Sequence, residues 1–448
     1  MNDSGNVTET LARFAAETPA ARIPDAVRHE AKRALLNILA TGVRGSLDPT
    51  FQKLLGSLPT AAQGRATIVG RTERADPLDA AFLNAAGANV DDFCDTHLAT
   101  VIHPTAPVMP ALYALCELQR VRGIDLLDAF AIGVEIECRI GNAISPAHYR
   151  TRGWHITASC GVFGAAAAAG RLLGLDAKRM VWALGGAATQ ACGLVEMLGQ
   201  PTKSLGVGNA ARNGLWSAQL AQRGFAGPPR PLEGRFGFFN ATGEAPKLPA
   251  LVGGLGDTWE LASNAYKPYP GGVVIHPVID GVLELRARGA FKTADIARVL
   301  VHGHPLLSER ADRPHVTTGR EAQVSVQHSV AAAQIYGDAG LDQYTDACVN
   351  EPAVLELRRK VEVVQDADIP VETAVVELWT HDGRHHRAAI EAARGSAGRP
   401  LSDRELELKF ESLAGSRVRD GRKLIDAVWA FDQADDASRI LAMTVPAS

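Results

Sequence analysis

The sequence contains no uninterrupted apolar run of the roughly 20 residues that a membrane-spanning helix needs. Its first residues, MNDSGNVTETLARFAAETPA, are polar and lack the apolar core of a secretion signal. Charge of either sign is nearly balanced, because 46 Lys and Arg face 50 Asp and Glu, giving a net charge of −4. A nucleic-acid-binding domain typically carries a basic patch instead. We therefore expect a cytoplasmic protein that binds neither a membrane nor nucleic acid.

Cysteine is scarce, and none of the six cysteines forms a CxxC pair. Most of them stand in apolar helical stretches, where a free cysteine usually behaves as a small buried hydrophobe. The sequence also lacks a G-x-S-x-G elbow, a P-loop and an H-E-x-x-H motif. These absences argue against a disulfide framework, a zinc knuckle and the common hydrolase, nucleotide and metalloprotease sites.

Alanine-rich helical periodicity is abundant from about residue 24 to residue 220. DLLDAFAIGVEIECRIGNAI and GVFGAAAAAGRLLGL predict buried helices, the second with small residues that let helices approach closely. The pattern changes near Ala265, after which β-branched residues alternate with polar ones. Asp382-Gly383 lies between two such alternating stretches and is a strong hairpin signal.

Two domains are the natural expectation for 448 residues. We predict a mainly helical protein in which residues 1–265 form an all-helical domain and residues 266–400 form a smaller α+β domain. The tail contains DRELELKFESLAG and GRKLIDAVWAFDQ, which again have helical character. We expect residues 401–448 to pack back on the helical domain and complete it.

The stretch DDFCDTHLATVIHP gathers acids and imidazoles ahead of an ordinary apolar helix. Such groups are costly to bury without partners, and proton transfer needs them. Asp92 and Thr96 are four residues apart and share a face if the stretch is the end of a helix or a turn. His103 precedes a proline, which disfavours helix and predicts a loop. We favour ordinary helix capping for Asp91 and Asp95, and a functional role for the other three.

A second polar cluster, HYRTRGWHITASCG, precedes a helix of small residues. His155 falls close to the start of that helix, where free backbone N–H groups favour an anion. A neutral imidazole there can act as a base or donate a hydrogen bond to a carboxylate. The alternative is a solvated basic loop, which suits Arg150, whereas Tyr149 and His155 remain candidate site residues.

Two lysines are candidates for binding an anion. Lys203 precedes the Gly-rich start of a helix in GQPTKSLGVGNAARNG. The G-x-G-x-x-A pattern in that segment lacks the preceding strand that a dinucleotide site requires, so we discount nucleotide binding. Lys267, close to His276 in NAYKPYPGGVVIHP, stands at the entry to the second domain. Each lysine alone could be an exposed or snorkelling side chain, but together they could bind a substrate with several carboxylates.

The remaining histidine pairs give little support for a metal site. His302 and His304 alternate along a predicted strand with no acidic residue nearby in the sequence. His385 and His386 follow the predicted hairpin turn and are expected to be exposed. We therefore predict no metal.

Four segments together resemble the MmgE/PrpD family: DDFCDTHLATVIHPTAPVMPAL, RGWHITASCGVFGAAAAAGRLLGL, PTKSLGVGNAARNGLWSAQLAQRGFAGPP and AYKPYPGGVVIHPVIDGVLEL. They follow the family's order over nearly the whole chain. The resemblance implies a large all-helical domain, a smaller α+β lid domain, an active site in the cleft between them, a homodimer and no required cofactor. It also implies that the family's site residues correspond to Asp92, Thr96, His103, His155, Lys203 and Lys267.

Members of this family dehydrate 2-methylcitrate, decarboxylate cis-aconitate or epimerise iminodisuccinate. All three reactions make or protonate a carbanion next to a carboxylate, which requires a positioned base and stabilisation of the enediolate charge. The decarboxylase has a tyrosine near an RP element of the lid, where this chain reads SERADRPHV and offers Arg310 or another non-aromatic residue. We therefore expect a dehydratase of a small hydroxy-polycarboxylate first, an epimerase second and a decarboxylase third. A non-catalytic scaffold is the alternative outside enzymes.

The resemblance and the residue types together suggest a division of roles. Asp92 and Thr96 would orient the site and tune its charge, and His103 would move the proton. His155, with Tyr149, would be the second acid or base. The carboxylates of a di- or tricarboxylate substrate would be bound by the two lysines, Lys203 and Lys267.

Overall fold

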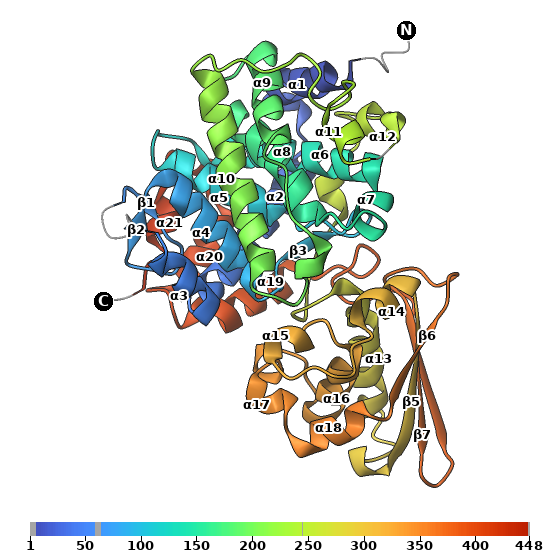
Figure 1. Cartoon of the computed structure of the whole chain (residues 1–448). Coiled ribbons are helices and arrows are strands. Elements are labelled where there is room, and N and C mark those ends of the chain that lie inside the picture. The colour runs from blue at the N-terminus through green and yellow to red at the C-terminus, as the bar shows by residue number, and fades with distance from the viewer. Residues whose placement is uncertain (1–5, 59–63, 244, 447–448) are drawn as a thin grey trace.

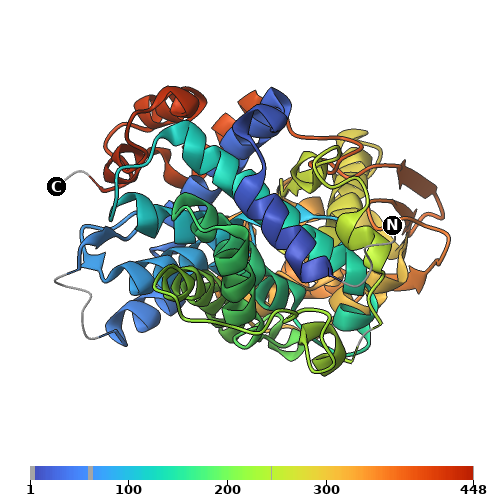
Figure 2. The ribbon, with the colours of Figure 1, turned by 90° about the horizontal axis from the view of Figure 1, so that it is seen from above.

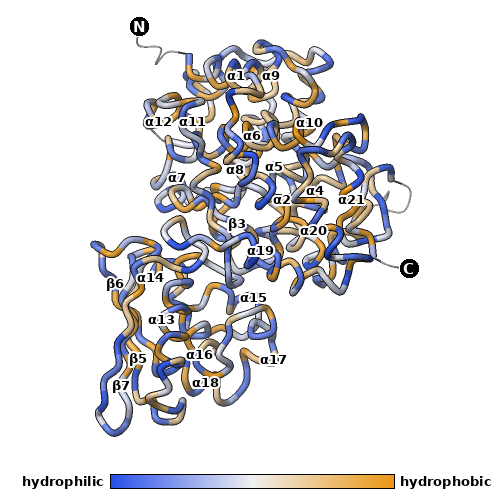
Figure 3. Tube along the Cα trace, turned by 180° about the vertical axis from the view of Figure 1, so that it is seen from behind, coloured by the Kyte–Doolittle hydropathy of each residue, from blue (hydrophilic) through white to orange (hydrophobic). Residues whose placement is uncertain are grey.

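The computed structural model describes residues 6–58, 64–243 and 245–446. These residues form two lobes, a larger helical domain and a smaller α+β domain (Figure 1). Each lobe has its own hydrophobic core, and hydrophobic residues are spread through both lobes along the chain trace (Figure 3). No helix in the described part of the chain is long and apolar enough to cross a membrane.

The helical domain is built from the first half of the chain and a little beyond. Its helices are α1 Val7–Glu17, α2 Asp25–Gly45, α3 Pro49–Gly56, α4 Pro77–Val90, α5 Thr105–Cys116, α6 Gly123–Ile144, α7 Ala147–Arg150, α8 Ile156–Leu172, α9 Ala177–Ala188, α10 Thr202–Gln222, α11 Phe238–Ala241 and α12 Leu248–Val252. Two short ribbons accompany them: β1 Ala66–Thr67 with β2 Arg74–Ala75, and β3 Asp95–His97 with β4 Asn264–Tyr266.

Small residues let the central helices pack closely, as the sequence predicted. A β-carbon added at Gly133 of α6 would lie 2.7 Å from the carbonyl oxygen of Gly164 in α8. One added at Gly214 of α10 would lie 2.5 Å from the β-carbon of Ala165. Both distances are too short for real carbon contacts, so larger residues would force these helices apart.

The α+β domain contains one mixed sheet and the helices packed on it. Its elements are α13 His276–Ala287, β5 Ile296–Gly303, α14 Pro305–Ala311, α15 Gly319–Ala322, α16 Val326–Tyr336, α17 Asp346–Val349, α18 Pro352–Arg358, β6 Val361–Gln365, β7 Ala374–Thr380 and β8 His385–Ile390. The strand order is β6-β5-β7-β8, with β5 and β6 parallel and the other pairs antiparallel. Strands β7 and β8 form the hairpin predicted at Asp382-Gly383.

The C-terminal helices return to the helical domain. They are α19 Asp403–Phe410, α20 Gly421–Trp429 and α21 Arg439–Ala442, and they lie in the same lobe as the N-terminal helices in two views at right angles (Figures 1 and 2). The ammonium of Lys409 donates to the Asn37 side chain of α2 at 2.8 Å. Lys32 of α2 donates to the carbonyl of Trp429 at 2.9 Å. Leu406, Phe410, Leu424 and Val428 of the tail also belong to the core of the helical domain, so packing of apolar helix faces holds the tail in place.

Candidate functional site

A two-stranded ribbon brings the acidic stretch next to the start of the α+β domain. In the ribbon Thr96 of β3 pairs with Ala265 of β4, so Lys267, directly after β4, lies beside the turn that precedes β3. Asp92 and Thr96 would share a face if the stretch were the end of a helix or a turn, and the structure does not meet this condition, because α4 ends at Val90 and Thr96 is in a strand. The ribbon, and not a helical turn, brings the site together.

Asp92 occupies a strained position in the turn. Its φ is 49°, in the left-handed region that few residues other than glycine adopt. The carbonyl of Asp92 accepts from the Gly271 backbone at 2.9 Å and from Lys267 Nζ at 3.1 Å. Gly271 itself has φ 102°, and a β-carbon there would lie 2.2 Å from the carbonyl oxygen of Gln323. The α+β domain therefore holds this turn in its unusual conformation.

The carboxylate of Asp92 joins both candidate lysines. Its Oδ1 accepts from Lys203 Nζ at 2.7 Å and from Lys267 Nζ at 2.9 Å. Lys267 also donates to the carbonyl of Gly271 at 2.8 Å, so its ammonium is surrounded by acceptors of the protein itself. Lys203 has no second acceptor among the described residues. One lysine is thus fully engaged, and the other keeps donors available.

Electrostatics favour the charged form of this carboxyl despite its burial. Burial alone raises the pKa of Asp92, but the positive charges of Lys203 and then Lys267 hold it well below the usual 3.8. Asp92, Lys203 and Lys267 therefore form a buried cluster with one net positive charge. Such a cluster can attract an anion even though the whole protein is negative.

His103 is oriented so that one ring nitrogen is free to act as a base. Its Nδ1 lies 2.8 Å from the carbonyl oxygen of Asp95 and 3.0 Å from Thr96 Oγ1. Because a carbonyl oxygen only accepts, this contact assigns the imidazole proton to Nδ1. Nε2 is then unprotonated and faces Asp92 Oδ1 at 3.5 Å, which is beyond hydrogen-bond length.

The surroundings of His103 also keep its ring neutral. Burial is the largest cause that lowers its pKa well below 6.5, and the positive charges of Lys267 and Lys203 add to it. Asp92 opposes them without reversing the direction. A neutral imidazole with a bare nitrogen in an electropositive cluster is suited to remove a proton from an acidic carbon.

His155 and Tyr149 lie within electrostatic reach of the cluster, because the charge of Asp92 acts on both side chains. His155 is the N-cap residue of α8, and its side chain makes no hydrogen bond within the described part of the chain. Burial, then the charge of Lys203, lowers its pKa to about 3. The half-buried ring of Tyr149, on α7, lies beneath the guanidinium of Arg310 at 4.9 Å. Both side chains can face a ligand that contacts Lys203.

The structure adds His276 to the candidate site residues. In the sequence, only its position close to Lys267 indicated such a role. Its Nε2 is buried and has no hydrogen-bond partner. Burial, then the charge of Lys267, lowers its pKa to about 3, and both residues line one small pocket. A buried nitrogen without a partner is rare, so His276 belongs among the candidate site residues.

Lys409 of α19 holds the backbone next to the cluster in place. Its ammonium donates to the carbonyls of Phe93 and Lys267 at 2.7 and 2.8 Å. Burial lowers the pKa of this lysine to about 7. It therefore ties together the residues that follow Asp92 and the backbone of Lys267. No sequence motif indicates this contact, because the C-terminal tail supplies it from a distance along the chain.

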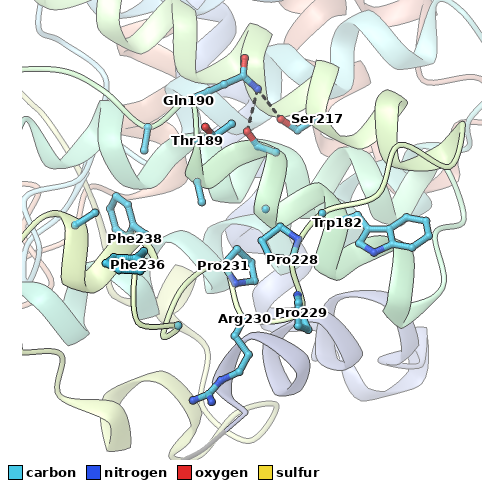
Figure 4. Close-up of a pocket in the computed structure, with 18 of the residues that line it drawn as sticks. Trp182, Thr189, Gln190, Ser217, Pro228, Pro229, Arg230, Pro231, Phe236 and Phe238 are labelled. Atoms are coloured by element: carbon cyan, nitrogen blue, oxygen red, sulfur yellow. Dashed lines mark hydrogen bonds between the residues drawn. The ribbon is translucent and has the colours of Figure 1, made fainter.

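A larger opening lies elsewhere on the helical domain. This groove, of about 1170 Å³, is lined mainly by apolar side chains, including Trp182, Pro228, Pro229, Pro231, Phe236 and Phe238 (Figure 4). Among its polar residues, Gln190 donates to Ser217 at 2.9 Å. It contains neither the lysines nor the histidines of the cluster. Its chemistry suits contact with an apolar surface, not proton transfer.

Two histidines of the sheet contact one carboxylate. His302 lies 3.0 Å from Glu377, and His385 lies 3.2 Å from the same carboxylate. Among the described residues, no group of three His, Cys, Asp or Glu side chains is arranged to hold a metal ion.

Comparison with known proteins agrees with this architecture. Residues 9–250 match the MmgE/PrpD N-terminal domain, and residues 269–433 match the MmgE/PrpD C-terminal domain. Cis-aconitate decarboxylase from Aspergillus terreus is 28% identical over 99% of this chain and 96% of that protein. Cis-aconitate decarboxylase from Mus musculus is 29% identical over 97% of this chain and 92% of that protein. The chain belongs to the MmgE/PrpD family.

Proposed function

We propose that this protein is an enzyme that moves a proton at a carbon next to a carboxylate of a small polycarboxylate. The observation that carries the proposal is the bare Nε2 of His103, fixed by the Asp95 carbonyl and facing the cluster of Asp92 and two lysines. A base beside buried positive charge can both remove the proton and stabilise the enediolate that results.

The contacts suggest a role for each candidate residue. His103 is the base, with its tautomer set by the Asp95 carbonyl and its ring position supported by Thr96. Lys203 contacts the carboxylate of the substrate, because its ammonium has donors to spare, whereas Lys267 positions Asp92. His155, assisted by Tyr149, is the second acid or base.

Dehydration of a hydroxy acid is the reaction that this arrangement supports best. Elimination needs a base at one carbon and a proton donor at the leaving hydroxyl. His103 can supply the base, and the phenol of Tyr149 beside the neutral His155 can supply the donor. Decarboxylation is a second candidate because the similar proteins from Aspergillus terreus and Mus musculus are named cis-aconitate decarboxylases. It needs an acid to protonate the carbanion, and it leaves the bare nitrogen of His103 without a substrate proton to remove.

A screen of di- and tricarboxylates in deuterated water tests the proposal. Enzyme-dependent exchange at a carbon next to a carboxylate is expected for at least one acid. A new alkene with loss of water identifies a dehydratase, release of carbon dioxide a decarboxylase, and label without net change an epimerase. Binding of these acids with no exchange and no product would favour a non-catalytic binding protein and contradict the proposal.

The pH dependence of turnover follows from the two lowered histidine pKa values. Because burial and the lysines keep His103 and His155 neutral, acid should not remove the base near the ordinary imidazole pKa of about 6.5. We expect kcat/KM to stay level as the pH falls from 8 through 6.5, once ionisation of the substrate is taken into account. A half-maximal rate near pH 6.5 would show that the catalytic imidazole is ordinary and exposed.

We also propose that the chain forms a homodimer through the groove of Figure 4. Three large apolar side chains that line it are exposed: Trp216 by 45%, Phe225 by 68% and Phe236 by 85%. Clustered exposed aromatic side chains are typical of a protein interface, where they supply much of the binding energy.

Sedimentation equilibrium tests the dimer. The wild type is expected at twice the 47.5 kDa of one chain, and Phe236→Glu should shift it towards the monomer, because a charge would be buried unpaired. Leu408→Glu is the matched control, since Leu408 is 48% exposed on α19 and lies outside the groove. A dimer that survives Phe236→Glu and Trp216→Glu, or a monomeric wild type, would refute this interface.

A further inference from the structure

Two arginines of the α+β domain reach towards the site without a carboxylate partner. Arg310 lies in the last turn of α14, and Arg313 follows shortly after it. Neither guanidinium makes a hydrogen bond or an ion pair with any residue that the structure describes. Moreover, the Nε of Arg310 is buried, which makes an unsatisfied donor there costly.

The acids nearest to these arginines in the sequence are already engaged. Glu309 accepts from Arg150 of α7, with 3.3 Å between Nε and Oε2, and so links the two domains. Asp312 accepts from the side chain of Gln327 at 2.5 Å. The two guanidinium groups therefore keep donors for an anion that comes from outside the chain.

Both guanidinium groups contact residues of the helical domain that are close to the cluster. The guanidinium of Arg310 lies over the ring of Tyr149, a cation–π contact that occupies none of its N–H donors in a hydrogen bond. Arg313 lies against Gly199, where an added β-carbon would be 3.4 Å from Nη1. Gly199 is four residues before Lys203, at the loop that leads into α10. The arginines therefore border the ligand-facing side of the cluster.

Charges of both the Asp92 cluster and the two arginines act on the phenol of Tyr149. Burial raises the pKa of its phenol, while Arg310 lowers it, Asp92 raises it and Arg313 lowers it. Tyr149 thus lies within electrostatic reach of both the Asp92 cluster and the arginines. Main-chain contacts also fix Arg313, whose N–H donates to Gln327 at 3.1 Å and whose carbonyl accepts from Ser325 at 2.7 Å.

We propose that Arg310 and Arg313 bind a second carboxylate of the substrate, remote from the carbon where the proton moves, and restrict the enzyme to acids with at least two carboxylates. This inference rests on the proposed function, since it assumes that Lys203 contacts the first carboxylate. A guanidinium suits this role because its planar donors match the two oxygens of a carboxylate.

Matched ligands isolate the remote carboxylate. Succinate and butyrate have the same chain length and differ in one terminal carboxylate, as do glutarate and valerate. Isothermal titration calorimetry should show that the wild type binds the diacid of a pair at least tenfold more tightly. Arg310→Gln, Arg313→Gln and the double variant should lose most of this preference and bind the monoacids as before. Arg359→Gln, an exposed position of the same domain, controls for the loss of one charge.

Two results would overturn the inference. One is a diacid preference that the double variant retains, and the other is an equal loss for diacids and monoacids, which would indicate a general disturbance of the site. The proton-transfer proposal remains valid after either result if exchange in deuterated water persists and depends on His103. If the wild type binds no carboxylate and exchanges no proton, the proposed function fails first, and the inference fails with it.

Discussion

Replacing Asp92 by Asn should reduce turnover by about 100-fold or more and also destabilise the fold. The substitution keeps the shape of the side chain but removes the negative charge between Lys203 and Lys267, which lie 2.7 and 2.9 Å from the same oxygen. Breaking a buried ion pair in this way typically costs about 3–5 kcal/mol, because it leaves charge without compensation. Losing a preorganised electrostatic contact commonly lowers kcat by a factor of about 100–1,000. Urea unfolding and steady-state kinetics measure the two effects.

Asp91→Asn is the matched control for this variant. Burial raises the pKa of Asp91, and its Oδ2 has no hydrogen-bond partner. Removing this charge should therefore leave stability unchanged or slightly higher, and turnover should stay near that of the wild type. Equal losses in both variants would show that the turn tolerates no amide, and the special role of Asp92 would be refuted.

Acid should narrow the difference in stability between the wild type and Asp92→Asn. The folded protein holds the pKa of Asp92 well below 3.8, so folding favours the ionised carboxylate. The stabilisation is present in full above the unfolded pKa and is lost as the pH falls below about 3.8 towards the folded value. Urea unfolding should show a smaller difference in the free energy of unfolding between the two proteins near pH 3.5 than at pH 7.

Local patterns predicted the elements of the fold well. The buried helix predicted from DLLDAFAIGVEIECRIGNAI is α6, Gly123–Ile144, because helix propensity and apolar periodicity act over a few residues. The loop at His103 and the hairpin at Asp382-Gly383 follow from proline and turn chemistry in the same way. Strand β6, Val361–Gln365, was not predicted, since it pairs with β5 across an intervening run of helices.

The contacts that complete the site were harder to predict. The residue types of the cluster are visible in the sequence, but the ribbon of β3 and β4, which joins them, is a pairing over a long distance along the chain. Lys409 comes from the C-terminal tail, and Arg310 meets Tyr149 across the boundary between domains. Non-local contacts of this kind depend on packing of whole elements and leave no periodic signal.

Replacing His103 by Ala should abolish most turnover while the protein stays folded. A positioned general base typically contributes a factor of about 100–10,000 to the rate, and the bare Nε2 of His103 is the imidazole nitrogen that faces Asp92. The change removes two contacts of Nδ1, at 2.8 and 3.0 Å, so we expect a loss of stability of at most about 2 kcal/mol. Thermal unfolding and kcat/KM on the substrate found in the exchange screen measure both.

His97→Ala, in the same segment, should affect stability and not turnover. His97 is buried, lies 3.0 Å from Glu260 and contacts Thr100 at 2.9 Å, but it does not contact the cluster. We expect this variant to lose stability and to keep turnover per folded molecule. Added imidazole should restore part of the activity of His103→Ala, because a small base can occupy the space that the side chain leaves, and should not affect His97→Ala. Full activity in a folded His103→Ala protein would remove the base from the proposed mechanism, and with it the argument that the Asp92 cluster is built for proton transfer.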